Sequence, residues 1–246
     1  VTDADDVPAE IIYPRNRPAP KPIVATEDAP ALDAVPFTPA PLPDYVETDI
    51  VRPSQARAGE DGFETASESA RDADAARREG IALHALLQHL GKVAPEQWPH
   101  VAVRALEALS PQHPERYAAL ANKAIAILEA PANAALFGPG SRAEVPVLAH
   151  ASREGKPVLI AGRIDRLVVT NDTVLIVDFK SDAAPPQDAG SVPAAYRTQL
   201  ALYQLVMEKL FPGRAISAAL FWTATESLMP VPNDLLKSEI GGFTIE

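Results

Sequence analysis

The chain has 246 residues, no cysteine and a formal net charge of −11. The absence of cysteine excludes structural disulfides, thiolate zinc sites and Cys-ligated iron–sulfur clusters within this chain. It contains no run of 18 apolar residues and no signal-peptide pattern, so we expect a soluble protein. Because it begins at Val1 rather than at Met, we expect it to be part of a longer protein.

The negative charge is concentrated toward the N-terminus. Residues 1–79 carry 17 acidic and 8 basic side chains, whereas residues 80–246 carry 16 and 14. A strongly acidic segment repels nucleic acid, but a nearly neutral one does not. The overall charge therefore argues weakly against a DNA partner for the N-terminal segment and leaves the remainder open.

Proline dominates the start of the chain. Residues 1–55 contain 11 of the 25 prolines, a density that excludes helices and long strands. Residues 56–72 are small, polar and acidic. We therefore predict a Pro-rich, acidic, extended linker over residues 1–72 that is largely irregular. A plain spacer is favoured over a docking arm, for which residues 11–13 or 50–51 would be the apolar anchors.

A helical part is predicted over residues 73–131, at the start of a domain that spans residues 73–246. Three helical patterns, separated by glycine or proline, predict helices over residues 73–90, 95–109 and 114–130. The first carries His84 on the same side as Ile81 and Leu87. A histidine on an apolar stripe is more often a satisfied core residue than a ligand, so His84 by itself does not predict a site.

A sheet-containing part is predicted over residues 141–232. Apolar runs predict strands over residues 143–149, 215–223 and 228–232 and on either side of the turn at residues 170–173, with a helix from about residue 193 to 210. The two strands beside the turn form a hairpin whose faces are both apolar near the turn. Strands of this kind belong to a sheet that helices cover on each side. The predicted fold class is therefore α/β.

The register of this hairpin brings charged residues together. If Asn171 and Asp172 are the two turn residues, Asp165 lies opposite Asp178, and the strand period of two places Lys180 on the same face as Asp178. Two carboxylates about 5 Å apart repel by on the order of 3 kcal/mol at an effective dielectric of about 20. A divalent cation would offset this repulsion, and oxygen ligands suit Mg²⁺ or Mn²⁺.

An alternative explanation needs no metal ion. Each aspartate has an arginine close by in the hairpin, Arg163 or Arg166, and could form an ion pair with it at a strand end. The spacing alone favours the metal site over these ion pairs but leaves both open.

A polar stripe marks the helix predicted after the hairpin. Tyr196, Gln199 and Tyr203 are spaced i, i+3 and i+7 and therefore share one side of that helix. The stripe is compatible with a half-buried helix edge or with a surface that holds a phosphate or a base.

These residues, in this order, resemble the RecB-like branch of the PD-(D/E)XK nucleases, and within it the C-terminal nuclease domain of AddA-type helicase–nucleases. The resemblance covers about residues 52–232. It depends on the following motifs: Arg52-Pro53-Ser54, Gly80-x-x-x-His84-x-x-Leu87, Glu144-Val-Pro146, Gly162-Arg-Ile-Asp165, Asp178-Phe179-Lys180 and Tyr196-x-x-Gln199-x-x-x-Tyr203.

The resemblance implies a mixed central sheet flanked by helices and a role for each motif residue. Metal ligands would be His84, Asp165, Asp178 and the backbone carbonyl of Phe179, with Mg²⁺ or Mn²⁺ as the ion. Lys180 would orient or deprotonate the attacking water and stabilise charge on the phosphate. Gln199 and Tyr196 would steady the site or the DNA strand, and the resemblance gives Glu144 no definite role.

The resemblance also implies a biological setting. The substrate would be DNA, as single strands from an unwound duplex, cut exonucleolytically during double-strand-break repair in a bacterial cytoplasm. The partners would be a helicase portion of the same longer chain and an AddB-type partner protein. The alternative is a nuclease-like fold that serves only as a DNA-binding or scaffolding module.

Overall fold

A computed structural model of the chain describes residues 48–55, 70–182 and 184–246, without the side chains of residues 70–77. The linker predicted over residues 1–72 lies mostly outside these described residues. All of the described residues belong to one compact unit. No helix in the described part combines the length and apolar character that crossing a membrane requires.

Six α-helices are described, and proline fixes where several of them start. The helices are α1 (Ala70–Leu90), α2 (Trp98–Leu109), α3 (Tyr117–Glu129), α4 (Ala134–Phe137), α5 (Ala194–Leu210) and α6 (Asn233–Glu239). A 3₁₀ turn that begins with proline precedes each of α2, α3 and α4, because proline fits the first helical turn but not the interior. The three helices predicted before residue 131 are confirmed.

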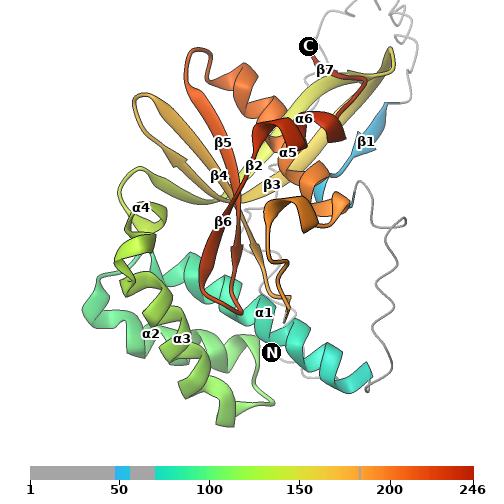
Figure 1. Ribbon diagram of the computed structural model, residues 1–246. Helices are drawn as coiled ribbons and strands as arrows, with labels where there is room; N and C mark the ends of the chain where they lie inside the picture. Colours follow the sequence, from blue (N-terminus) through green and yellow to red (C-terminus); the bar gives the residue numbers. More distant parts are fainter. Residues whose placement is uncertain (1–47, 56–69, 183) are drawn as a thin grey trace, which may run out of the picture. The chain divides into compact units, whose positions relative to one another are not determined.

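Seven strands form one mixed sheet (Figure 1). They are β1 (Asp49–Val51), β2 (Ser141–Arg153), β3 (Lys156–Val169), β4 (Thr173–Lys180), β5 (Ala215–Trp222), β6 (Ser227–Val231) and β7 (Phe243–Ile245). The strand order is β6-β5-β4-β3-β2-β7, and β1 pairs with β3. The pairs β1–β3 and β4–β5 are parallel, and the others are antiparallel.

Both faces of the sheet are buried, as predicted from the hairpin. One core packs the sheet against α5 and α6 and includes Ile176 and Tyr203. The other packs it against α1, α2 and α3 and includes Val177 and Leu87. Because neighbouring residues of β4 point to opposite cores, the hairpin needs apolar residues on both faces. The helices lie on the two sides of the sheet in Figure 1, and the predicted α/β fold is confirmed.

The sheet extends beyond the predicted boundaries at both ends. The prediction ended the sheet-containing part at residue 232, but α6 and β7 follow. At the N-terminal side, β1 pairs with residues 158–160 of β3, and Pro53 is buried. The spacer interpretation is therefore wrong for residues 49–55: the β1 backbone pairs with β3 and Val51 packs against the core, although the side chain of Ile50 is 50% exposed. A three-residue strand has almost no sequence signal because its hydrogen-bond partners lie more than 100 residues away.

A close contact at Gly162 ties this N-terminal segment to the sheet. A Cβ atom at Gly162 would lie 2.9 Å from the hydroxyl of Tyr203 and 3.0 Å from Cδ of Pro53. Tyr203 is 1% exposed, and its hydroxyl donates to the carbonyl of Arg163 at 2.8 Å, so it has little room to move. Only glycine fits between these side chains.

We expect Gly162→Ala to lower the free energy of unfolding by about 1–3 kcal/mol, the usual cost of overpacking. Urea denaturation measures this change. Gly241→Ala is the matched control, because a Cβ there meets nothing within 4 Å, and its expected change is within about 0.5 kcal/mol. Equal midpoints for Gly162→Ala and the unmodified chain would contradict the prediction.

Candidate metal centre

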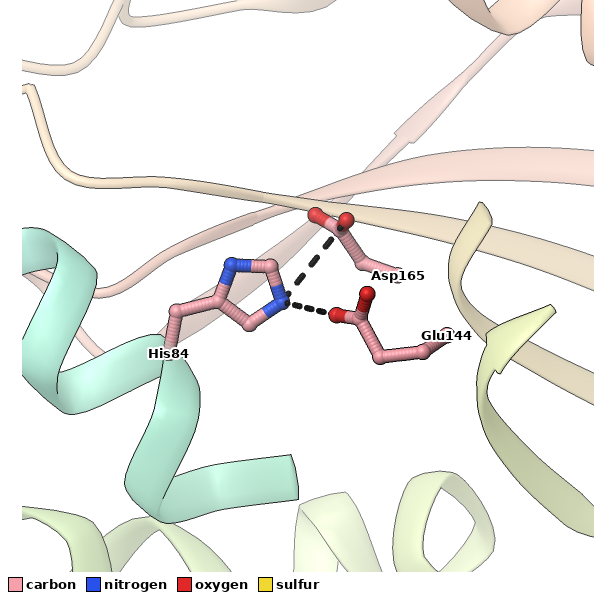
Figure 2. A group of neighbouring side chains, drawn as sticks. All are labelled: His84, Glu144 and Asp165. Carbon is pink, nitrogen blue, oxygen red and sulfur yellow. Dashed lines mark ion pairs between the residues drawn. The ribbon is translucent and has the colours of Figure 1, made fainter. Parts of the chain in front are cut away.

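Three potential metal ligands from separate elements converge beside the sheet. His84 extends from α1, Glu144 from β2 and Asp165 from β3 (Figure 2). Nε2 of His84 lies 3.1 Å from Oε1 of Glu144 and 3.6 Å from Oδ1 of Asp165. One ligand atom from each residue lies within 4.8 Å of the other two. This is the spacing of atoms that can bind one ion.

Strand pairing brings the two carboxylates together. Ala143 pairs with Arg166 and Val145 with Ile164, so the same register places Glu144 opposite Asp165. Glu144 adopts φ 55°, in the left-handed region that non-glycine residues seldom occupy. Strain of this kind persists where the surrounding structure over-determines a residue, often at functional sites.

The electrostatics of the centre favour a bound cation. Burial, with the nearby charge of Asp178, raises the pKa of Asp165 to about 8, although the N–H of Phe179 and the charge of Lys180 act in the opposite direction. Burial also lowers the pKa of His84 below its ordinary value, against the attraction of Glu144. At neutral pH the imidazole is therefore neutral and available as a ligand, and Asp165 holds a proton that a bound cation would displace.

The donor set fits a hard divalent cation. Nε2 of His84 is buried and, although it lies 3.1 Å from Oε1 of Glu144, it makes no hydrogen bond of good geometry with any described residue, so this nitrogen is available to a cation. Two carboxylate oxygens and one imidazole nitrogen are acceptable ligands of Mg²⁺ or Mn²⁺. A cation here would also favour the ionised form of Asp165, which burial disfavours.

A second group of polar side chains lies next to this centre. Nζ of Lys180 lies 2.7 Å from Oδ2 of Asp178, donates to Oε1 of Gln199 at 2.9 Å and sits 4.0 Å above the ring of Tyr196. Nε2 of Gln199 donates to Oδ1 of Asp178 at 2.7 Å. Asp178, Lys180 and Gln199 thus form a closed, largely buried triangle.

Asp182 and Tyr203 support this triangle, and the sequence did not predict either role. The hydroxyl of Tyr196 donates to the carboxylate of Asp182, and burial together with that carboxylate raises the pKa of Tyr196. Tyr203 bonds to both backbone polar groups of Arg163 and holds β3 against α5. The position of Asp182 two residues after Lys180 was the only sequence signal for it.

The predicted ligand set is brought together only in part. The hairpin register is confirmed from Val169↔Val174 to Arg166↔Val177, but the ladder ends there. Oδ2 of Asp165 instead accepts the N–H of Phe179 at 2.8 Å. The three-residue cluster therefore contains Glu144, which the sequence did not predict as a ligand, and not Asp178. The ligand roles of Asp178 and of the Phe179 carbonyl stay predictions.

The arginine alternative is wrong in the described structure. Arg163 pairs with Glu144, at 3.2 Å, and not with an aspartate. Arg166 donates to the carbonyl of Leu87. Among the described residues, neither arginine forms an ion pair with Asp165 or Asp178.

A cavity of about 170 Å³ opens beside the centre. It is lined by the following residues: Gly80, Ile81, His84, Phe179, Lys180, Ser181 and Thr223. A Cβ at Gly80 would lie 2.5 Å from the hydroxyl oxygen of Ser181, so glycine lets α1 approach the end of β4. The cavity exposes His84 and Lys180 to the same small volume.

The comparison with known families agrees with this geometry. Residues 58–234 match the sequence model of the PD-(D/E)XK nuclease superfamily, which is more than half of the chain. The chain belongs to this superfamily. The sequence Asp178-Phe179-Lys180, inside the matched range, has the spacing of an Asp-x-Lys motif.

Two individual proteins extend the comparison. Over 71 residues the chain is 38% identical to an ATP-dependent helicase/nuclease protein of Bacillus pumilus (strain SAFR-032). This match covers 26% of the chain and only 6% of that relative. SSO0001, of known crystal structure, is 19% identical with a TM-score of 0.30, and the match covers 64% of this chain and 81% of SSO0001.

Proposed function

We propose that this PD-(D/E)XK domain is a divalent-metal-dependent deoxyribonuclease. The observation that carries the proposal is the convergence of His84, Glu144 and Asp165 beside the Asp178–Lys180 pair. Three potential metal ligands next to a partly buried lysine amine suit hydrolysis of a phosphodiester, because negative charge accumulates on the phosphate in the transition state.

The chain's own residues divide the work. His84, Glu144 and Asp165 would hold Mg²⁺ or Mn²⁺, with Asp178 as a further candidate ligand; such an ion supplies positive charge toward the phosphate and lowers the pKa of water. The ammonium of Lys180 stabilises developing charge or orients the attacking water. Gln199 fixes the side chains of Asp178 and Lys180 relative to each other, since it bonds to both.

We further propose that the domain acts within a longer helicase–nuclease. The name of the Bacillus pumilus relative, which describes an ATP-dependent helicase/nuclease, supports this proposal. A helicase portion of the same chain would supply single strands, an AddB-type protein would be the partner, and cleavage would be exonucleolytic during double-strand-break repair.

Cleavage of end-labelled single-stranded DNA tests the proposed activity. We expect the chain to cut the strand with Mg²⁺ or Mn²⁺ and to stop in EDTA. Asp178→Asn removes the charge that holds Lys180 and is expected to lower the rate by about 10²-fold or more. The control is Asp172→Asn, in the exposed hairpin turn, which should cut at the unmodified rate. If the Asp178 and Asp172 variants cut equally well, the assignment of the site is wrong.

A further inference from the structure

Arg166 is a buried cation that the proposed chemistry does not use. It is 4% exposed, and burial lowers its pKa to about 10 although the charges of Asp165 and Glu144 act in the opposite direction. Its Nε makes no hydrogen bond with any described residue. Burying a guanidinium costs free energy unless its contacts compensate, so these contacts indicate what the residue does.

Arg166 contacts two helices: α1, which carries His84, and α4. Its Nη2 donates to the carbonyl of Leu87 at 3.0 Å, and its guanidinium lies 4.7 Å from the centre of the Phe137 ring. The carbonyl of Leu87 belongs to the last turn of α1, where unpaired carbonyls and the helix dipole favour a positive charge. Arg166 therefore holds the C-terminal turn of α1 against β3.

The bond between Arg166 and the carbonyl of Leu87 connects the segments that carry Asp165 and His84, two of the three candidate metal ligands. Arg166 directly follows Asp165 in β3, and both side chains reach α1: Asp165 lies beside His84, and Arg166 bonds to Leu87. Leu87 follows His84 by three residues, which is about one helical turn. One side chain thus links the residue next to Asp165 with the helical turn next to His84. The distance between their ligand atoms, 3.6 Å, depends on how α1 docks on β3.

We propose that Arg166 is a positioning residue for the metal centre: its bond to the carbonyl of Leu87 sets the placement of His84 relative to Asp165 and Glu144. The proposal rests on the metal centre of the proposed function. Arg166 touches neither the ion nor the substrate in this assignment. It acts through His84 and is not a catalytic residue.

Whether Arg166→Met strengthens or weakens cation binding distinguishes a positioning role from a purely electrostatic effect. Arg166→Met keeps most of the side-chain volume and removes both the charge and the bond to Leu87. Removing a positive charge close to a cation site should tighten cation binding. Misplacing a ligand should weaken binding, by about tenfold if the effect resembles the loss of an outer-shell partner. Positioning therefore predicts a change opposite in sign to the electrostatic one.

Titration of the full chain with Mn²⁺, followed by the electron paramagnetic resonance signal of the free ion, measures this without any nuclease assay. We expect Arg166→Met to weaken Mn²⁺ binding about tenfold. Arg104→Met, at an exposed position on α2, is the matched control and should leave binding unchanged. In a His84→Ala background, Arg166→Met should cause no further loss, because the ligand that it positions is gone.

Each outcome decides the proposal. Unchanged or tighter Mn²⁺ binding by Arg166→Met overturns the proposal. It is also overturned if Arg166→Met weakens Mn²⁺ binding equally with His84 present and with His84→Ala. Failure of the unmodified chain to bind Mn²⁺ overturns the metal centre itself and this assignment with it. If Arg166→Met lacks a cooperative unfolding transition, Arg166→Lys decides in the same two backgrounds. It keeps the charge but loses the planar donor pair, and should weaken binding severalfold only where His84 is present.

Discussion

Asp165→Asn is expected to stabilise the metal-free protein while it abolishes metal binding. Asparagine can keep the bond from the N–H of Phe179 through its oxygen and can donate to Nε2 of His84 through its amide. It carries no charge to repel Asp178 or Glu144. At high pH we expect the metal-free variant to exceed the unmodified protein by on the order of 3 kcal/mol in free energy of unfolding.

The pH dependence follows from the raised pKa of Asp165. This pKa is about 8 in the folded protein and near its ordinary value of 3.8 in the unfolded chain. Between these values the folded state holds a proton that the unfolded state has released, so the stability contributed by this group falls as pH rises from about 4 to 8. Without metal, the free energy of unfolding of Asp165→Asn should not show this decline with pH. The difference in stability between the variant and the unmodified chain should be largest above pH 8.

Metal should reverse the order of stability. A ligand that binds only the folded state stabilises it by about 2.7 kcal/mol at a free concentration of 100 times Kd. Thermal unfolding with and without Mn²⁺ should therefore show a large rise in Tm for the unmodified chain and almost none for Asp165→Asn. Asp172→Asn in the exposed turn should behave as the unmodified chain does. A metal-induced rise of equal size in the Asp165 variant would refute the ligand assignment.

Lys180→Met is expected to lower the rate of DNA cleavage by about 10²–10³-fold while metal binding is retained. Removing a positioned group that stabilises transition-state charge costs a factor of this size in other enzymes. Lys180 pairs with Asp178 but is absent from the three-residue ligand cluster. Loss of its charge should leave Mn²⁺ affinity equal or slightly higher, since a competing cation has been removed.

The measurement is single-turnover cleavage of single-stranded DNA at saturating metal, with Mn²⁺ affinity determined on the same samples. Lys209→Met, at an exposed position near the end of α5, is the control for loss of a lysine. If Lys180→Met cuts at the unmodified rate, Lys180 has no catalytic role. If it loses Mn²⁺ binding in parallel with activity, its role is to maintain the ligands rather than to act on the phosphate.

Local patterns were sufficient for much of the fold. The helices over residues 95–109 and 114–130 and the turn at residues 170–173 were predicted, because their signals lie within a few residues of one another. The strand β1 and the elements α6 and β7 were missed. Their hydrogen bonds and packing come from residues far away in the sequence, and no local period marks them.

The sequence by itself determined the hairpin register, the apolar faces of the sheet and the presence of Asp178 and Lys180 on one strand face, since turn length and the strand period of two fix all three. Only the tertiary structure decided which side chains share one ion site. The β3–β4 ladder ends before Asp165 and Asp178, and Asp165 turns to the N–H of Phe179. Glu144 and His84 then join it because β2 pairs with β3 and α1 packs on the sheet, and such distances follow from packing rather than from spacing along the chain.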